Sequence, residues 1–108
     1  MSSLNGPVLS FWTKFEIEDE WDCGKVQIST NGGTNWVNLT GQYTTAASGK
    51  GTQVPSGSPI YDGAQTNWVN EVIDLSPYSL NQIKLRFELK TDGSINKDGW
   101  YLDDIGIY

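Results

Sequence analysis

Strict alternation of apolar and polar residues is the feature that most constrains this chain. Between Gln82 and Lys90, apolar residues alternate with charged ones: Ile83, Leu85, Phe87 and Leu89 against Lys84, Arg86, Glu88 and Lys90. Successive side chains of a β-strand point to opposite faces, so this segment is predicted to be a strand with one buried face. The charged face is expected to be solvated or ion-paired, and it is a weak candidate for recognition.

Other segments show the same strand character. They are residues 7–17, 25–30, 35–40, 68–75 and 99–108. Asn31-Gly32-Gly33 predicts a tight hairpin turn between the second and third of them. Residues 41–65 are rich in Gly, Ser, Thr and Pro and predict a long loop, with one edge strand near Gln53-Val54. Because no helical period appears, we predict an all-β fold: a two-sheet antiparallel β-sandwich of roughly six to eight strands.

Length and composition exclude several classes of protein. The 108 residues predict one domain, with residues 1–6 as a linker-like start. A net charge of −6 makes nucleic acid an improbable partner, and no apolar run is long enough to insert into a membrane. The single Cys23 excludes an internal disulfide and is expected to be a small buried filler. The sequence begins without a signal peptide, and Met1-Ser2-Ser3 leads directly into strand-like residues, as in a fragment of a longer protein.

Two adjacent carboxylates interrupt the last strand. Strand alternation places Asp103 on the face of Tyr101 and Asp104 on the face of Trp100. At least one of them is therefore expected in or beside packed apolar surface, where an unpaired charge costs several kcal/mol, roughly. Some partner must neutralise it.

The motifs follow one another in an order that resembles a known family. They are Leu9-Ser10-Phe11-Trp12, Glu18 with Asp22, Val26-x-Ile28-Ser29-Thr30-Asn31-Gly32-Gly33-x-x-Trp36, Trp68 with Ile73-Asp74-Leu75-Ser76, Ile83-x-Leu85-x-Phe87 and Gly99-Trp100-Tyr101-Leu102-Asp103-Asp104-Ile105. This order resembles the MAM-like jelly-roll accessory domains of immune inhibitor A-type and related secreted bacterial proteases. The resemblance implies a non-catalytic, extracellular module of a larger parent protein that stabilises, positions or adheres. Such domains usually begin with a further strand, so either that strand is missing here or an edge is open for self-association.

The resemblance also implies a structural calcium ion that ties the first acidic loop to the last strand. Five of the thirteen acidic residues lie between Glu16 and Asp22, with no basic residue among them. Glu18, Asp22, Asp103 and Asp104 are the candidate ligands, and loop carbonyls would complete the roughly six to eight oxygens that calcium prefers. The alternative is that the acidic cluster is solvated and that Asp103 and Asp104 pair with lysines or backbone amides.

Two further motifs match calcium or propeller signatures only in part. Ser94-x-Asn96-x-Asp98-Gly99 resembles the start of an EF-hand loop, but Ile105 stands where the loop needs Glu and no helices flank it. The segment is therefore predicted to be an Asx-rich turn. The Ser29–Trp36 hairpin resembles an Asp-box, but propellers need several copies. We interpret that hairpin as structural.

The sequence favours binding or structure over catalysis. Without any His, Ser-His-Asp and Cys-His sites are excluded, and no catalytic residue is predicted. A carbohydrate-binding module is the alternative, because Trp and Tyr stack on sugar rings in polysaccharides and cell-surface glycans. Its candidate residues are Trp12, Trp21, Tyr61 and Trp68, which lie outside or at the ends of the apolar faces. The competing interpretation places these aromatic side chains in the core.

Overall fold

The computed structural model describes residues 7–18, 20–78, 83–91 and 99–108. Within these ranges the chain forms strands and no helix. The strands are β1 (Val8–Ile17), β2 (Cys23–Ser29), β3 (Val37–Asn38), β4 (Thr45–Ala46), β5 (Pro59–Ile60), β6 (Gly63–Asp74), β7 (Lys84–Lys90) and β8 (Gly99–Ile107). None of the described residues belongs to a helix that could cross a membrane.

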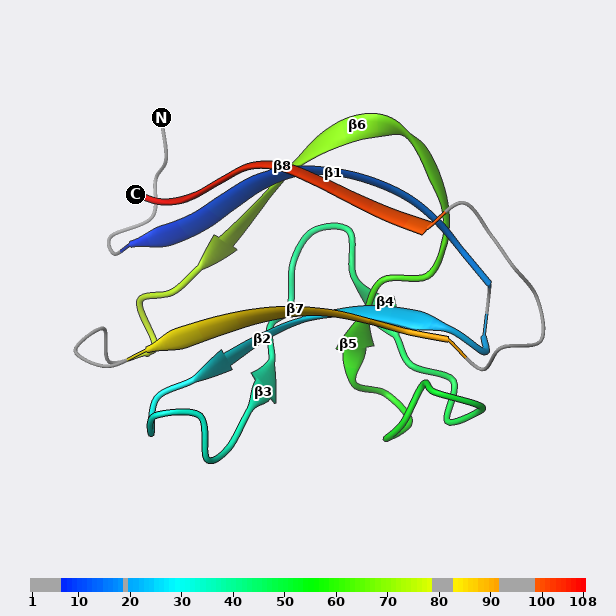
Figure 1. The fold of residues 1–108 in the computed structure, drawn as a ribbon, viewed down its shortest axis with the longest axis horizontal. Helices are drawn as coiled ribbons and strands as arrows, with labels where there is room; N and C mark the ends of the chain where they lie inside the picture. Colours follow the sequence, from blue (N-terminus) through cyan, green and yellow to red (C-terminus); the bar gives the residue numbers. More distant parts are fainter. Residues whose placement is uncertain (1–6, 19, 79–82, 92–98) are drawn as a thin grey trace.

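The strands form two antiparallel sheets that face each other (Figure 1). One sheet has the order β6-β1-β8 and the other has the order β3-β2-β7, so β1 and β2 are the central strands. A small β4-β5 pair adjoins the edge of β2 opposite β7, where a bridge joins Gly24 to Tyr61. The predicted all-β antiparallel sandwich is confirmed.

The core lies between the sheets, where the inward faces of β1 and β2 meet. The alternation predicted for residues 7–17 holds, because every second residue of β1 from Leu9 to Ile17 is buried. Phe11 packs edge-on against Phe87 of β7, with ring centroids 5.4 Å apart. Trp100 of β8 lies so close to Gly24 that a Cβ there would sit 2.8 Å from its ring. Aromatic side chains of β7 and β8 therefore join the two sheets on one side of the central strands.

Four predicted elements differ from the structure. No strand forms at Gln53-Val54, because the amides of these two residues donate to the carbonyls of Lys50 and Thr52 within the same loop. The pair β4-β5 forms within the predicted loop instead, and β6 begins at Gly63, earlier than expected. Its polar first half is held as a strand by pairing with the end of β1, a tertiary contact that overrides local preference. β3 is short because the hairpin turn extends to Trp36.

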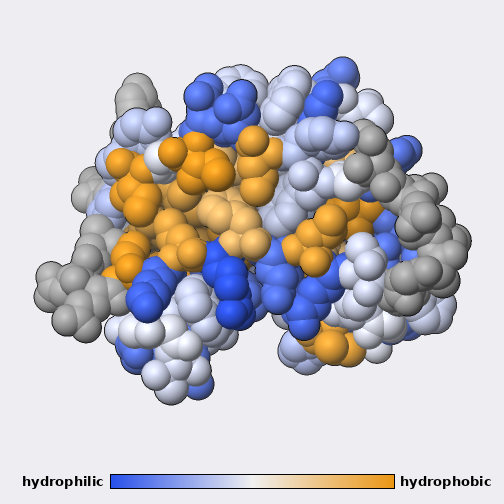
Figure 2. Space-filling model, viewed as in Figure 1, coloured by the Kyte–Doolittle hydropathy of each residue, from blue (hydrophilic) through white to orange (hydrophobic). Residues whose placement is uncertain are grey.

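On one side of the sandwich, each sheet ends in an edge strand. The outer edges of these two strands pair with no other described residues. These edge strands are β7 and β8. Ile105, Ile107 and Leu89 are exposed there, with 50%, 49% and 44% of their surfaces accessible. Figure 2 shows the apolar surface gathered between the two sheets on this side. We call it the open edge.

Candidate functional site

The connection between β1 and β2 carries two buried acidic residues. Glu18 follows β1 and Asp22 precedes β2, and the Asp22 amide donates a hydrogen bond to the Glu18 carbonyl at 3.1 Å. Only 8% of Glu18 and 2% of Asp22 are exposed. Carboxylate oxygens are among the hard ligands that calcium prefers, and two carboxylate residues lie in this one short turn. This turn, which we call the acidic end, is therefore the strongest candidate for a cation site.

Asp62 joins the acidic end from the other side. It precedes Gly63, which pairs with Ile17 at the end of β1. Its Oδ2 accepts hydrogen bonds from the Glu20 amide at 3.1 Å and from Gln53 Nε2 at 2.8 Å. Gln53 also donates to the Asp22 carbonyl at 2.7 Å. Sequence reasoning missed Asp62 because it lies in a stretch with no periodic pattern.

Asp103 and Asp104 lie elsewhere. Asp103 of β8 pairs with Trp12 of β1. Trp12 precedes Glu18 by six residues, which corresponds to ~20 Å along a strand. Both carboxylates are on exposed residues. The expectation of a partly buried carboxylate in the last strand is wrong. The structure also does not unite the four predicted calcium ligands.

A β-bulge explains the two adjacent acidic residues. The register of β1 with β8 shifts between Ser10 and Trp12, which leaves Asp104 and its neighbour opposite one residue of β1. Asp104 has a φ of 50°, a left-handed conformation that Asp tolerates better than most residues. Its amide donates to Asp103 Oδ1 at 2.9 Å. The backbone, as in the alternative interpretation, thus serves as a partner of Asp103.

The described residues contain no complete carboxylate cage. Among residues 7–18, 20–78, 83–91 and 99–108, no three His, Cys, Asp or Glu side chains are arranged to hold a metal ion. The EF-hand-like motif and the predicted Asx-rich turn fall largely on residues 92–98, outside the described ranges. Glu18 and Asp22 therefore fit calcium as hard oxygen ligands, but only as part of a ligand set.

Tyr61 is not available for binding, so its prediction as a ligand-binding residue is wrong. The side chain is completely buried, and its ring packs against Phe15 and Trp100 at centroid distances of 5.7 and 5.4 Å. Its hydroxyl donates to Glu71 Oε2 at 2.9 Å. Burial and the nearby Glu71 carboxylate raise the pKa of Tyr61 far above its usual range. Tyr61 is a core residue.

Glu71 is a buried carboxylate that sequence reasoning missed. It is completely buried and faces the core opposite Phe11. Its Oε1 accepts from the amides of Gln42 and Val72 at 2.8 and 3.2 Å. Its Oε2 accepts from the Tyr43 amide at 3.0 Å as well as from the Tyr61 hydroxyl. Glu71 therefore anchors the turn after β3 to the sandwich. The sequence feature that could have identified Glu71 is its position on the apolar face of residues 68–75.

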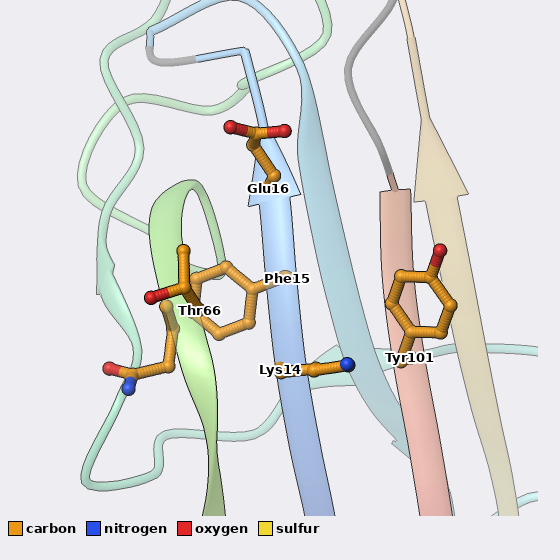
Figure 3. Close-up of a pocket in the computed structure, with 6 residues that line it drawn as sticks. Lys14, Phe15, Glu16, Thr66 and Tyr101 are labelled. Carbon is orange, nitrogen blue, oxygen red and sulfur yellow. The ribbon is translucent and has the colours of Figure 1, made fainter.

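The outer face of the first sheet brings Trp12 and Trp68 to one region. They are 42% and 43% exposed. Lys14, two residues from Trp12 on the same face of β1, lies between the rings of Trp68 and Tyr101, with its Nζ 5.1 and 5.2 Å from their centroids. Figure 3 shows Lys14 extended toward Tyr101 beside a pocket of about 120 Å³. We call this group the outer aromatic cluster.

Trp21 lies apart from this cluster. It is 42% exposed and sits in the acidic end, with Lys50 Nζ 5.8 Å from its ring. Its carbonyl accepts from the Thr52 amide at 2.9 Å, so the indole belongs to the contact between two loops. The four predicted aromatic residues therefore divide into a pair on one face, one loop residue and one core residue.

Two other features match their predicted structural roles. Cys23 is buried with Ala47 and Ile60, and burial raises the pKa of its thiol, which disfavours the nucleophilic thiolate. In the hairpin after β2, the Asn31 side chain accepts from the Asn35 amide at 2.9 Å, and Ser29 Oγ accepts from the Gly33 amide at 2.9 Å. These hydrogen bonds stabilise the turn of the hairpin itself.

Comparison with known proteins identifies the family of the chain. Residues 5–108 match the family model "Immune inhibitor A-like, MAM domain". The chain is 32% identical over 97 residues to Bacillopeptidase F of Bacillus subtilis, covering 90% of this chain and 5% of that protein. It is 31% identical over 99 residues to the Pre-pro-metalloprotease PrtV of Vibrio cholerae, covering 92% and 10%. No solved structure matches the chain. The chain thus belongs to the family of immune inhibitor A-like MAM domains.

Proposed function

We propose that this chain is a non-catalytic accessory domain of a larger extracellular protein, of the protease class. One observation carries the proposal: the matching regions make up only 5% and 10% of relatives whose names are those of a peptidase and a metalloprotease. So small a share leaves the remainder of each relative for its catalytic part. The absence of His from the 108 residues is consistent with this role, because the chain cannot build a His-dependent nucleophile.

Two assays test the accessory role. The purified domain is expected to release no peptides from casein, whereas removing it from a parent protease should change the yield or thermal inactivation of that protease. Turnover of a short peptide by the remaining protease should stay the same. Peptide release by the purified domain would overturn the proposal. Export of the parent chain, measured by fractionating cells from medium, tests the extracellular location.

We also propose that calcium binds at the acidic end and stabilises it. The support is the burial of Glu18 and Asp22 in one short turn, together with five acidic residues and no base between Glu16 and Asp22. Calcium accepts carboxylates, backbone carbonyls and water as ligands, and Asp62 lies beside this turn. The ion would bridge the two carboxylates and join the two sheets where β1 passes into β2.

Calcium titration by calorimetry tests this assignment. One ion should bind the wild-type domain, and Asp22→Asn should weaken binding at least tenfold. Asp103→Asn is the matched control, because that carboxylate is on the exposed strand ~20 Å away. Equal loss of affinity in both variants would refute the proposed position.

Binding of a polysaccharide or cell-surface glycan is the second candidate function, and the outer aromatic cluster favours it. Exposed aromatic rings beside a few polar groups are typical of ligand sites, and Gln65 and Thr66 line the adjoining pocket. A pull-down with insoluble polysaccharides should show retention that Trp12→Ala and Trp68→Ala abolish. Trp21→Ala is the control. Retention that survives both changes would contradict this site.

Self-association is a third proposal for a partner, and the open edge supports it. Unpaired strand edges with exposed apolar side chains can pair with another chain. Ile105 and Ile107 lie on β8 and Leu89 lies on β7, so a second copy would cover both sheets at once. Sedimentation of the domain at increasing concentration measures this association directly.

A further inference from the structure

A second hollow lies on the outer face of the β3-β2-β7 sheet, away from the outer aromatic cluster. It measures about 380 Å³, which falls within the range of roughly 300–1,000 Å³ that is typical of small-molecule sites. Its lining includes Lys25, Gln27, Trp36, Asn38, Val54 and Pro55. Strand residues form one wall and the loop before β5 forms the other. We call it the Lys25 pocket.

Lys25 gives this pocket an uncompensated positive charge. The residue stands in the central strand β2 and is only 8% exposed, yet it lines the pocket. Within the described part of the chain, its ammonium forms neither a hydrogen bond nor an ion pair. Glu88 stands opposite Lys25 across the strand pair, but the two side chains are not within ion-pair distance. The Nζ of Lys25 is not fully enclosed, so an anion that enters the pocket would form an ion pair with it.

The other polar groups of the pocket already hold one another in place. Gln27 Nε2 donates to Asn38 Oδ1 at 2.8 Å, and Arg86 Nε donates to Gln27 Oε1 at 2.9 Å. The Asn38 amide nitrogen donates to the Pro59 carbonyl at 3.1 Å. These hydrogen bonds hold the polar side chains of the pocket floor in place. The charge that the lining offers to a ligand is positive and comes from Lys25.

Arg86 supplies a second cation next to an aromatic wall. Its guanidinium lies 4.2 Å from the centroid of the Trp36 ring, and Trp36 lines the pocket. Val54 and Pro55 add apolar surface on the loop side. A ligand that suits this lining combines a compact, partly apolar ring with an anionic group. That combination occurs in a sugar that bears a carboxylate.

We propose that the Lys25 pocket binds the carboxylate of an acidic sugar unit, such as a uronic acid residue of a polysaccharide. The aromatic ring of Trp36 in the lining favours a sugar ring, and an acidic peptide is the competing class that the titration below separates from it. This site is separate from the acidic end and the outer aromatic cluster, and it depends on neither proposal made above.

Titration of the intact domain with trigalacturonate, followed by amide chemical shifts, tests the ligand class. Neutral maltotriose is the matched control, and penta-glutamate represents the acidic peptide. Trigalacturonate should bind at least tenfold more tightly than either control, with shifts centred on residues 25–27 and 36–38. Its affinity should fall as salt rises, because the contact is ionic. Equal affinity for maltotriose, or tighter binding of penta-glutamate, would overturn the proposal.

Paired variants test the position. Lys25→Met should weaken trigalacturonate binding at least tenfold, whereas Lys50→Met, at an exposed lysine that does not line the pocket, should leave it unchanged. Val54→Asp places a negative charge at the pocket rim on a residue that is 50% exposed, so the fold should tolerate it. That variant should also lose binding. Val72→Asp, at a 41% exposed position on the other sheet, is its control. Unchanged binding by folded Val54→Asp protein would refute the site.

Discussion

Glu71→Gln is expected to destabilise the domain strongly, although it changes only one atom of the side chain. The two carboxylate oxygens accept four hydrogen bonds, from the amides of Gln42, Tyr43 and Val72 and from the Tyr61 hydroxyl. In the Glu71→Gln variant one of these oxygens becomes an NH₂ group, which faces donors. The Tyr61 hydroxyl can rotate to accept a hydrogen bond, but a backbone amide cannot.

The magnitude follows from the hydrogen bonds lost. One backbone amide is left unsatisfied at a cost of about 1–3 kcal/mol, and the remaining hydrogen bonds lose their charge assistance. We expect a total of about 2–4 kcal/mol, which lowers the melting temperature of a domain of this size by roughly 10 °C. Urea unfolding followed by tryptophan fluorescence measures the free energy of unfolding.

Glu88→Gln is the matched control. Glu88 is a half-buried residue of β7 that makes none of these contacts, so its substitution should change the free energy of unfolding by less than about 0.5 kcal/mol. Equal stability of Glu71→Gln and the wild type would refute the reasoning. It would mean that the turn after β3 does not depend on the carboxylate.

Three other predictions concern the core and the open edge. The pKa of Tyr61 is higher in the folded than in the unfolded state, where it is about 10. The free energy of unfolding should therefore fall as pH rises above about 10, and Tyr61→Phe should lose less of it across that range in unfolding experiments. Gly24→Ala should lower stability by about 1–3 kcal/mol, because its methyl group would overlap the Trp100 ring, and unchanged thermal unfolding would contradict this packing. If copies of the domain associate through the open edge, Ile105→Lys should shift the sedimenting species to monomer while leaving the melting temperature within a few degrees, and a dimer that persists in this variant would exclude the edge as the interface.

The strands could be predicted where local pattern and tertiary pairing agree. Residues 8–17 and 84–90 alternate cleanly because one face of each is turned toward the core, and both are strands. The first half of β6 could not be predicted. Its residues Ala64 to Asn67 are polar or small, and its strand conformation depends on pairing with Phe15 to Ile17 of β1.

The candidate site was predictable in part, for a related reason. Glu18 and Asp22 could be found because both lie in one short acidic turn. Asp103 and Asp104 were grouped with them because a regular strand would have placed one carboxylate against the core. The β-bulge at Asp104 removes that requirement, and no sequence period reports a bulge. Lys25 has no distinguishing pattern in the sequence, because its burial depends on the distant loop before β5.

Thermal unfolding of the domain with calcium and with chelator tests the central claim most directly, which is that calcium joins Glu18 and Asp22 at the acidic end. At a hundredfold excess over the dissociation constant, a ligand that binds only the folded state adds about 2.7 kcal/mol, which should raise the melting temperature by roughly 10 °C. Asp22→Asn and Glu18→Gln should abolish that rise, and Asp104→Asn should keep it. A wild-type domain that melts at the same temperature with calcium and with chelator would contradict the account, as would a rise that both acidic-end variants retain.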